Sequence, residues 1–405
     1  MRVLHLEVLP VLQLCAANGP LFPNLKSLDF WPGTGEPVPF IPLFLSAGLT
    51  SINMVLFGSD NYGVTVVSLI AALPALCPNL QRITLQSLPR DGTVTAAVSG
   101  MLLASSRNAL QYIRVDSPLT VEAYEVICQL PSLRKLWVIV EGDVSLPSAV
   151  LPNLTKLMIQ HDGGSGWSQM FRGATLEKLD SIKFHSGLKQ PQEDFLETFE
   201  RVALSISAQN TLSKFSHYKS RSWNPNYSCL LPFTQLTHLV IEHPCNDVCS
   251  STVDDEVVTN LARAMPRLET LQLGDSPCSE IITGATVKGL VALAYHCLDL
   301  STLRIHFKVD SFRALPVDAG MAPEHESTVR RRECALKELD IGYTFVSEES
   351  ALVVALTLLR IFPHVQCTGW GGDGWDQVVD AINGSRQLVH YSSERLPARY
   401  ASGQL

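Results

Sequence analysis

Two glycine-rich segments carry the residue types that could hold a nucleophile or a phosphate. Gly163-Gly-Ser-Gly-Trp167 follows the nucleophile elbow Gly-x-Ser-x-Gly of hydrolases until its last position, where Trp167 replaces the required glycine. Gly369 to Gly374 is rich in glycine, but it is not followed by the Lys-Ser or Lys-Thr pair of a phosphate-binding P-loop. Neither segment therefore predicts a catalytic site.

A metal site is the other chemistry that the residue types suggest. Cys245 and Cys249 lie close to His243 in the sequence, and these three side chains could contact a metal ion. A fourth ligand is not evident, and the chain contains neither an H-E-x-x-H sequence nor a pair of C-x-x-C units. We therefore predict no metal, no cofactor and no enzymatic activity.

The composition is typical of an ordered chain that buries many apolar side chains. Of its 405 residues, 46% are hydrophobic and 17% are charged, and the net charge is −8. This charge argues against indiscriminate binding to nucleic acid or to anionic membranes. No run of about 18 apolar residues occurs, so no membrane span is predicted. His5 and Glu7 interrupt the apolar start, so we do not interpret it as a signal peptide.

The ten cysteines are scattered along the chain, mostly in apolar segments such as Ile127-Cys128. This distribution favours buried free thiols in a reducing compartment over disulfides. We therefore predict an intracellular protein of the cytoplasm, the nucleus or both. The triplet Arg330-Arg-Arg332 is interpreted as a solvated loop, with nuclear targeting as the alternative.

The pattern L-x-x-L-x-L recurs along the chain and organises it. In the segment 131–138, Leu133, Leu136 and Val138 face one side of a short strand, and Lys135 and Trp137 face the other. The first leucine of each repeat lies at Leu25, Leu49, Leu80, Leu110, Leu133, Leu154, Leu179, Leu212, Leu236, Leu268, Leu300 and Leu336. The gaps run from 21 to 36 residues, within or just above the range of leucine-rich repeats.

Three repeats depart from this regularity. In the repeat that begins at Leu212, His217 takes the third apolar position. A short entry repeat is expected to end near Leu6, and Phe362 to Cys367 is expected to form a final repeat. The whole array therefore contains about 12–14 irregular repeats.

Segments with the apolar spacing of helices lie between these strands. They are residues 64–76, 94–104, 121–130, 195–208, 257–265, 287–297 and 352–361. Asp254-Asp-Glu256 and Ser347-Glu-Glu349 are favourable helix starts, and Pro266 and Pro363 stop the preceding helices. The outer sides of the short repeats at Leu133 and Leu154 have room only for a turn or a single helical turn.

Alternation of strand and helix at this period predicts an α/β leucine-rich-repeat solenoid. Its parallel sheet should line the concave face of a curved horseshoe, and its helices the convex face. We assign residues 1–368 to the solenoid, with a loop insert near 308–334 and a shorter polar loop at 219–226. Residues 369–405 form a closing segment and tail, with a helix at 376–382 and with Trp370 and Trp375 covering the last repeat.

The third and fifth positions of each repeat should face away from the leucines, onto the concave surface. From Arg82 to Lys214 every repeat supplies one cation and no anion at these two positions. The resulting candidate partner-binding residues, called the basic band below, are Arg82, Tyr112, Arg114, Lys135, Trp137, Lys156, Met158, Lys183 and Lys214. One interpretation is ordinary solvated lysine and arginine. The other is a groove for an acidic or phosphorylated protein segment, with Tyr112 and Trp137 as anchors. A nucleic-acid groove is disfavoured by the net charge.

The repeats have the form P-x-L-x-x-L-x-L, as in Pro23-Asn-Leu-Lys-Ser-Leu28, Pro78-Asn-Leu-Gln-Arg-Ile83 and Pro152-Asn-Leu-Thr-Lys-Leu157. No asparagine ladder follows the strand. In this the chain resembles, over nearly its full length, the leucine-rich-repeat region of fungal F-box proteins. In that family an F-box docks on a Skp-type adaptor of a cullin ubiquitin ligase, and the repeats hold the substrate. Here Met1 lies almost inside the first repeat and no F-box precedes it, so adaptor and cullin are expected only if an F-box exists upstream.

The sequence thus predicts a protein-interaction scaffold. The resemblance implies the substrate-recognition repeats of an F-box-type ubiquitin ligase receptor that lacks its F-box. The alternative is a stand-alone regulatory protein of the ribonuclease-inhibitor type, which binds a partner without any link to a ligase.

Overall fold

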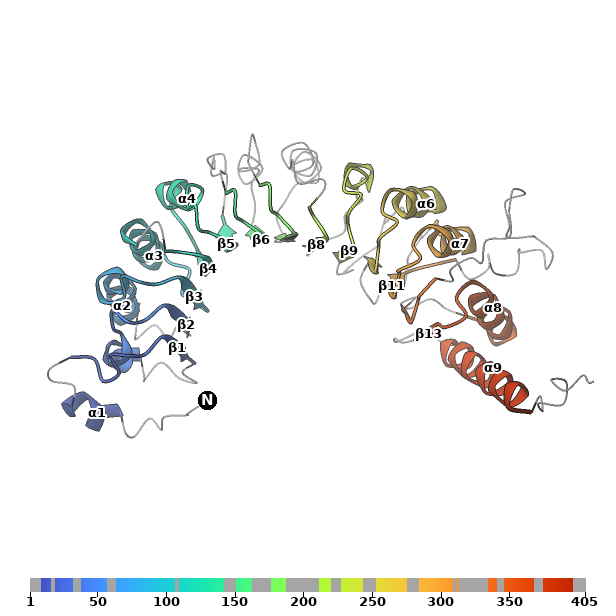
Figure 1. Ribbon diagram of the computed structural model, residues 1–405, viewed down its shortest axis with the longest axis horizontal. Coiled ribbons are helices and arrows are strands. Elements are labelled where there is room, and N and C mark those ends of the chain that lie inside the picture. Colours follow the sequence, from blue (N-terminus) through green and yellow to red (C-terminus); the bar gives the residue numbers. More distant parts are fainter. Residues whose placement is uncertain are drawn as a thin grey trace, which may run out of the picture. The chain divides into compact units, whose positions relative to one another are not determined.

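The computed structural model has α/β architecture, with parallel strands and helices that alternate along the chain (Figure 1). It describes residues 9–15, 19–31, 38–56, 63–105, 109–141, 151–161, 176–186, 211–219, 227–242, 253–274, 284–308, 312, 334–340, 346–367 and 374–395. The chain divides into two compact units, residues 1–218 and residues 219–405. Repeats continue on both sides of this division.

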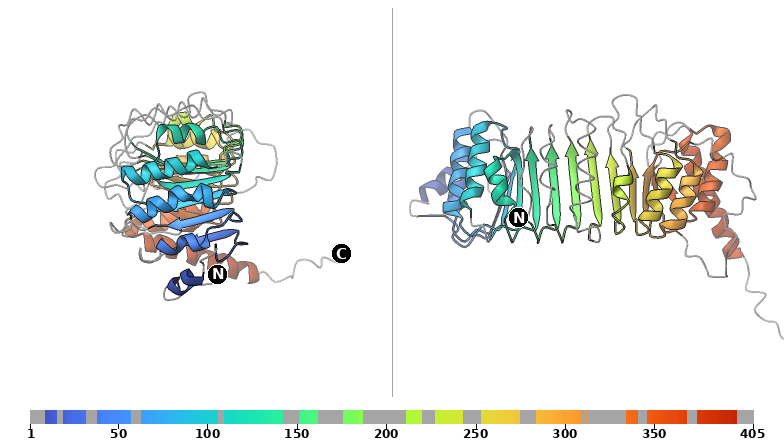
Figure 2. Two further views of the ribbon diagram at one scale, coloured as in Figure 1. Left: turned by 90° about the vertical axis from the view of Figure 1, so that its left-hand side faces the viewer. Right: turned by 90° about the horizontal axis from the view of Figure 1, so that it is seen from above.

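The strands of the first unit follow one another in chain order, and all their recorded pairings are parallel. They are β1 (Ser27–Phe30), β2 (Ser51–Val55), β3 (Arg82–Gln86), β4 (Tyr112–Pro118), β5 (Lys135–Val140), β6 (Lys156–His161), β7 (Ser181–Ser186) and β8 (Lys214–Lys219). Every one of them begins at the third position of its predicted repeat. The right-hand view of Figure 2 shows the green strands of this unit running side by side.

A repeated backbone contact fixes where each strand begins. Two successive N–H groups at the start of a strand donate to one carbonyl before the preceding strand. The N–H groups of Thr155 and Lys156, for example, both donate to the carbonyl of Arg134, at 2.8 and 3.0 Å. Because the same contact recurs from strand to strand, the third positions of successive repeats line up in register.

The first leucines of the repeats fill the space behind the strands. Leu133, Leu154 and Leu179 have no exposed surface, and burial of a leucine side chain is worth roughly 1.5–3 kcal/mol. His217, at the weakest repeat, is also fully buried in the predicted third apolar position. Leu25 is only half-buried, in the repeat of the first strand. The predicted division of each strand into a buried side and an open side is confirmed.

The helices of the first unit pack against the leucine side of the strands, and α2, α3 and α4 all lie on that side in Figure 1. The helical elements of this unit are α1 (Leu9–Cys15), the 3-10 helix η2 (Val38–Phe44), α2 (Gly63–Leu76), α3 (Gly92–Ala104) and α4 (Val121–Ile127). Asp91 caps α3, and its carboxylate accepts bonds from the N–H groups of Thr93 and Val94 at 2.9 Å. The opposite face of the strands carries the basic band.

The second unit repeats the alternation of strand and helix. Its elements are η5 (Tyr227–Leu230), β9 (His238–Glu242), α6 (Asp255–Ala264), β10 (Thr270–Leu273), α7 (Val287–His296), β11 (Thr302–Ile305), β12 (Glu338–Asp340), α8 (Glu348–Ile361), β13 (Gln366–Cys367) and α9 (Trp375–Arg395). As predicted, Asp254 caps α6 by accepting a bond from the N–H of Val257, and both proline-terminated helices end before Pro266 and Pro363.

Several elements differ from the sequence prediction. Helices α1, η2 and η5 were not predicted, because each is short and lacks a clear apolar period. In the final repeat Cys367 pairs with Leu339, whereas the predicted register paired Val365 with Leu339. A shift of two residues turns the same side chains to the same faces, so the alternation of residue types cannot reveal it.

Helix α9 runs to Arg395, well beyond the predicted end at Ile382. Asn383 and Gly384 are poor helix formers, but α9 packs against α8 and tertiary packing overrides local propensity. Trp375, expected to cover the last repeat, is 2% exposed at the start of this helix.

Other predictions concern residues outside the described part of the chain. They are the helix at 195–208, the entry repeat near Leu6, the outer turns after the repeats at Leu133 and Leu154, residues 220–226, nearly all of the insert at 308–334, His243 with Cys245 and Cys249, the segment 163–167 and Trp370.

The start of α7 depends on a carboxylate from the preceding helix. Asp255 on α6 accepts bonds from the N–H groups of Thr286 and Gly289, at 2.7 and 3.0 Å, and from the Thr286 hydroxyl at 2.6 Å. We expect Asp255→Ala to lower the stability of the second unit by roughly 1–3 kcal/mol, because these donors at a helix start lose a charged acceptor. Chemical denaturation measures this loss. The exposed neighbour Glu256→Ala is the control and should change little; equal effects would contradict the capping role.

Candidate functional site

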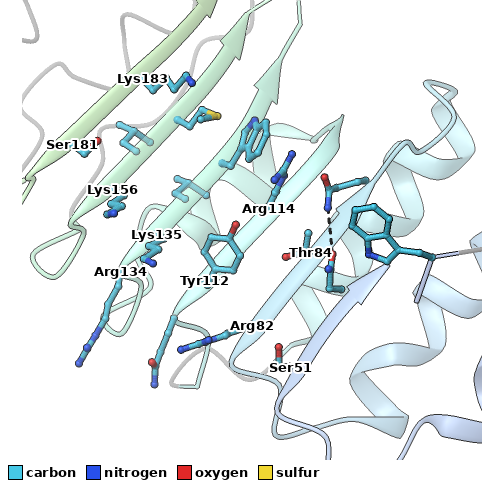
Figure 3. Close-up of a pocket in the computed structure, with 18 residues that line it drawn as sticks. Ser51, Arg82, Thr84, Tyr112, Arg114, Arg134, Lys135, Lys156, Ser181 and Lys183 are labelled. Atoms are coloured by element: carbon cyan, nitrogen blue, oxygen red, sulfur yellow. Dashed lines mark hydrogen bonds between the residues drawn. The ribbon is translucent and has the colours of Figure 1, made fainter. Parts of the chain in front are cut away.

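The basic band forms two rows across the open face of the first unit. The strand register aligns the third positions as one row and the fifth positions as another (Figure 3). We call the first the strand-start row, which consists of Ser51, Arg82, Tyr112, Lys135, Lys156 and Ser181. We call the second the central row, which consists of Asn53, Thr84, Arg114, Trp137, Met158 and Lys183.

These rows line a groove of about 910 Å³. Eight of the nine residues predicted from the sequence contribute to its walls or floor, from Arg82 on β3 to Lys183 on β7. Lys214, on β8, does not line it. The repeats therefore bring the predicted cationic and aromatic side chains to one groove, with the exception of Lys214.

The cations of the strand-start row are exposed and carry no carboxylate partner among the described residues. Lys135 and Lys156 are direct neighbours in register on β5 and β6, so their backbones lie about 4.8 Å apart across the sheet. The Lys135 ammonium lies 6.0 Å from the centre of the Tyr112 ring. Two adjacent like charges without a counter-ion make this row the part of the groove that most favours a negatively charged ligand.

The centre of the groove is organised differently. The Arg114 guanidinium stacks on the Trp137 ring, with its central carbon 3.2 Å from the ring centre, and its Nε lies 3.9 Å from the carboxylate of Asp116. The Trp137 indole N–H is buried and has no hydrogen-bond partner in the described part of the chain. Asp116 therefore partly offsets the charge of Arg114. Since Arg114 occupies one face of Trp137, that face cannot serve a partner as the open anchor that we predicted.

A third arrangement lies on β7 and β8, at the Lys183 end of the groove. The Lys183 ammonium lies 4.3 Å from the centre of the Tyr218 ring, and the His185 ring stacks on Tyr218 at 4.8 Å between ring centres. Burial, and then the charge of Lys183, lowers the pKa of His185 to about 4. His185 is therefore neutral at physiological pH, and Lys183 supplies the positive charge at this end.

Sequence reasoning missed four residues that matter to this face. Arg134 lines the groove from the turn before β5, and Figure 3 shows it extending past the starts of the strands. Trp31, directly after β1, lines the other end and is 67% exposed. Trp31, Asp116 and Tyr218 occupy the seventh position of their repeats, beyond the two positions considered. Extending the same alternation by two residues would have found all three, whereas Arg134 occupies the second position, before its strand begins.

The open face of the second unit contrasts with the basic band. Arg304 pairs with Asp340 at 3.1 Å, and Gln272 donates to the carboxylate of Glu242 at 2.9 Å. The polar side chains of this face thus pair with one another across neighbouring strands. Their internal pairing leaves less hydrogen-bonding capacity for a ligand than the lysines of the first unit offer.

Comparison with protein-family models finds no match for this chain. Comparison with characterised proteins finds none either. The groove and the residues around it are therefore the features that bear on the function of this chain.

The described residues offer little other chemistry. They contain no group of three or more His, Cys, Asp or Glu side chains placed to hold a metal ion. Among them, Cys77, Cys128, Cys297 and Cys334 are buried free thiols, and burial raises the pKa of Cys128 and Cys297 to about 12, so these two thiols stay protonated and unreactive. None of the described helices is both long and apolar enough to cross a membrane.

Proposed function

We propose that this chain is a protein-binding scaffold, and that the groove of its first unit holds an acidic or phosphorylated segment of the partner. One observation carries this proposal: the side-by-side lysines Lys135 and Lys156, exposed and without a carboxylate partner in the described part of the chain. Arg82 and Lys183 line the same groove. Phosphate and carboxylate groups bind well to such clusters, because each new ion pair also reduces the repulsion among the cations.

We further infer that the repeats are leucine-rich repeats of the horseshoe type, with the basic band on the concave side, in an intracellular protein. The parallel strand at each L-x-x-L-x-L segment and the helices on the leucine side support the repeat class. The free, buried thiols support the reducing compartment. The ligase-receptor role has its support in the resemblance of the repeats to those of fungal F-box proteins.

Affinity purification followed by mass spectrometry tests the scaffold role. We expect the captured proteins to carry acidic or phosphorylated segments and to be released by phosphatase treatment or by about 0.5 M salt, since salt screens exposed charges. A Skp-type adaptor and cullin among them would support the ligase receptor. Capture without ubiquitin machinery would favour a stand-alone binding protein of the ribonuclease-inhibitor type. Partners retained unchanged in high salt and after phosphatase would contradict the charge-based groove.

A further inference from the structure

The groove has two chemically different ends. Its basic end contains Lys135 and Lys156 in neighbouring strands, with Arg82 two strands from Lys135. At the other end lies Trp31, which directly follows β1 and lines the same groove. The proposed function uses only the basic end.

Trp31 is the feature of the second end that requires an explanation. It is 67% exposed, more than any other aromatic side chain in the described part of the chain. Exposed tryptophan is unfavourable in water, and tryptophan is among the residues that contribute most to binding when a partner covers them. No stacking or hydrogen bond within the described residues involves the Trp31 ring.

The groove floor next to Trp31 consists of polar, uncharged side chains from β2 and β3, and the exposed Asp29 on β1 is in register with Asn53 beside them. Gln86 donates a hydrogen bond to the side-chain oxygen of Asn53 at 3.3 Å, and Thr84 is almost fully buried beside them (Figure 3). Because none of these three side chains carries a positive charge, this stretch does not compete with the lysines for a negative charge. This polar stretch lies between the apolar contact offered by Trp31 and the charged contacts offered by Lys135 and Lys156.

The strand register gives the separation of the two ends. Trp31 lies four residues beyond the strand-start row of β1, or about 13 Å along the strand direction, and β5 lies four strands away, or about 19 Å across the sheet. The diagonal from Trp31 to Lys135 is therefore about 23 Å. An extended peptide covers this distance with about seven residues, at roughly 3.3 Å each.

We propose that the groove binds a bipartite segment, with a phosphoryl or carboxylate group at Lys135 and Lys156 and a large apolar side chain against Trp31, about seven residues apart. This inference rests on the proposed function, which supplies the charged half of the recognition. Trp31 is then a specificity-determining residue, because it selects among the many acidic segments that the lysines alone would accept.

Two peptide libraries about fifteen residues long test this inference on the full chain, one with a fixed phosphoserine and a matched one with serine at that position, and with all other positions varied. We expect the wild type to retain peptides with Trp, Phe, Leu or Met about five to nine residues from the phosphoserine, on one side of it. Trp31→Ala should lose this apolar preference and keep the preference for phosphoserine over serine. For a selected peptide, we expect about tenfold weaker binding to Trp31→Ala by fluorescence polarisation, and partial recovery with Trp31→Phe.

A matched control is Val64→Ala on α2, which truncates an apolar side chain that is 83% exposed and does not line the groove. It should change neither preference. Phosphoserine preference without apolar enrichment, or enrichment that persists in Trp31→Ala, would overturn the bipartite segment and leave the proposed function standing. No preference for phosphoserine or for acidic residues would overturn the proposed function itself.

Discussion

Reversing the charges of Lys135 and Lys156 together should weaken the binding of an acidic or phosphorylated segment by about 100-fold, or roughly 2.8 kcal/mol. The two side chains are register neighbours, so a negative group placed between them interacts with both. Lys135→Glu with Lys156→Glu replaces two attractions by two repulsions at the same place. Fluorescence polarisation with a phosphoserine peptide retained by the wild-type chain measures the change.

Both lysines are exposed, so the double variant should fold normally, and thermal unfolding should confirm this before binding is measured. The control is Lys288→Glu with Lys337→Glu, which changes the net charge by the same amount at two exposed lysines that neither belong to the basic band nor line the groove. It should retain most of the affinity. Equal losses in both double variants would indicate a general effect of net charge. Unchanged affinity in Lys135→Glu with Lys156→Glu would leave the basic band as ordinary solvated surface.

Most of the strand framework could be predicted because one physical constraint repeats. Each L-x-x-L-x-L segment must turn its leucines inward. The N–H groups of its second and third positions must also both donate to one carbonyl of the preceding repeat. Together these requirements fix the start of the strand to a single residue. The pairing of Cys367 with Leu339 was missed because β13 is only two residues long, and alternation cannot distinguish a shift by two.

The candidate site was predictable in position but not in conformation. Adjacent fifth positions place Arg114 beside Trp137, yet they do not show that the guanidinium would stack on the ring or that Asp116 would offset its charge. These contacts depend on rotamers, which the pattern of residue types does not specify. Trp31 was missed for a different reason, because it occupies the seventh position of its repeat and only the third and fifth positions were considered.

The start of α9 depends on a glycine, and Gly374→Ala should lower stability by more than about 3 kcal/mol or detach this helix. Gly374 has a φ of +85°, a conformation that costs other residues roughly 1–2 kcal/mol. A Cβ there would also overlap the carbonyl oxygen of Val346, which is backbone and cannot rotate away. Relief requires that the start of α9 move, and with it the buried side chains of Trp375, Val378 and Ile382.

Hydrogen exchange resolves this effect, because amides of α9 should lose protection in Gly374→Ala while those of the first unit keep theirs. Gly384→Ala provides a matched control within the same helix. A Cβ at Gly384 meets nothing within 4 Å, and alanine is the better helix former, so this change should stabilise α9 by about 0.5–1 kcal/mol. The two identical substitutions thus have opposite expected signs, ten residues apart. If both proved neutral, neither the close contact with Val346 nor the packing of α9 would govern the stability of the closing helix.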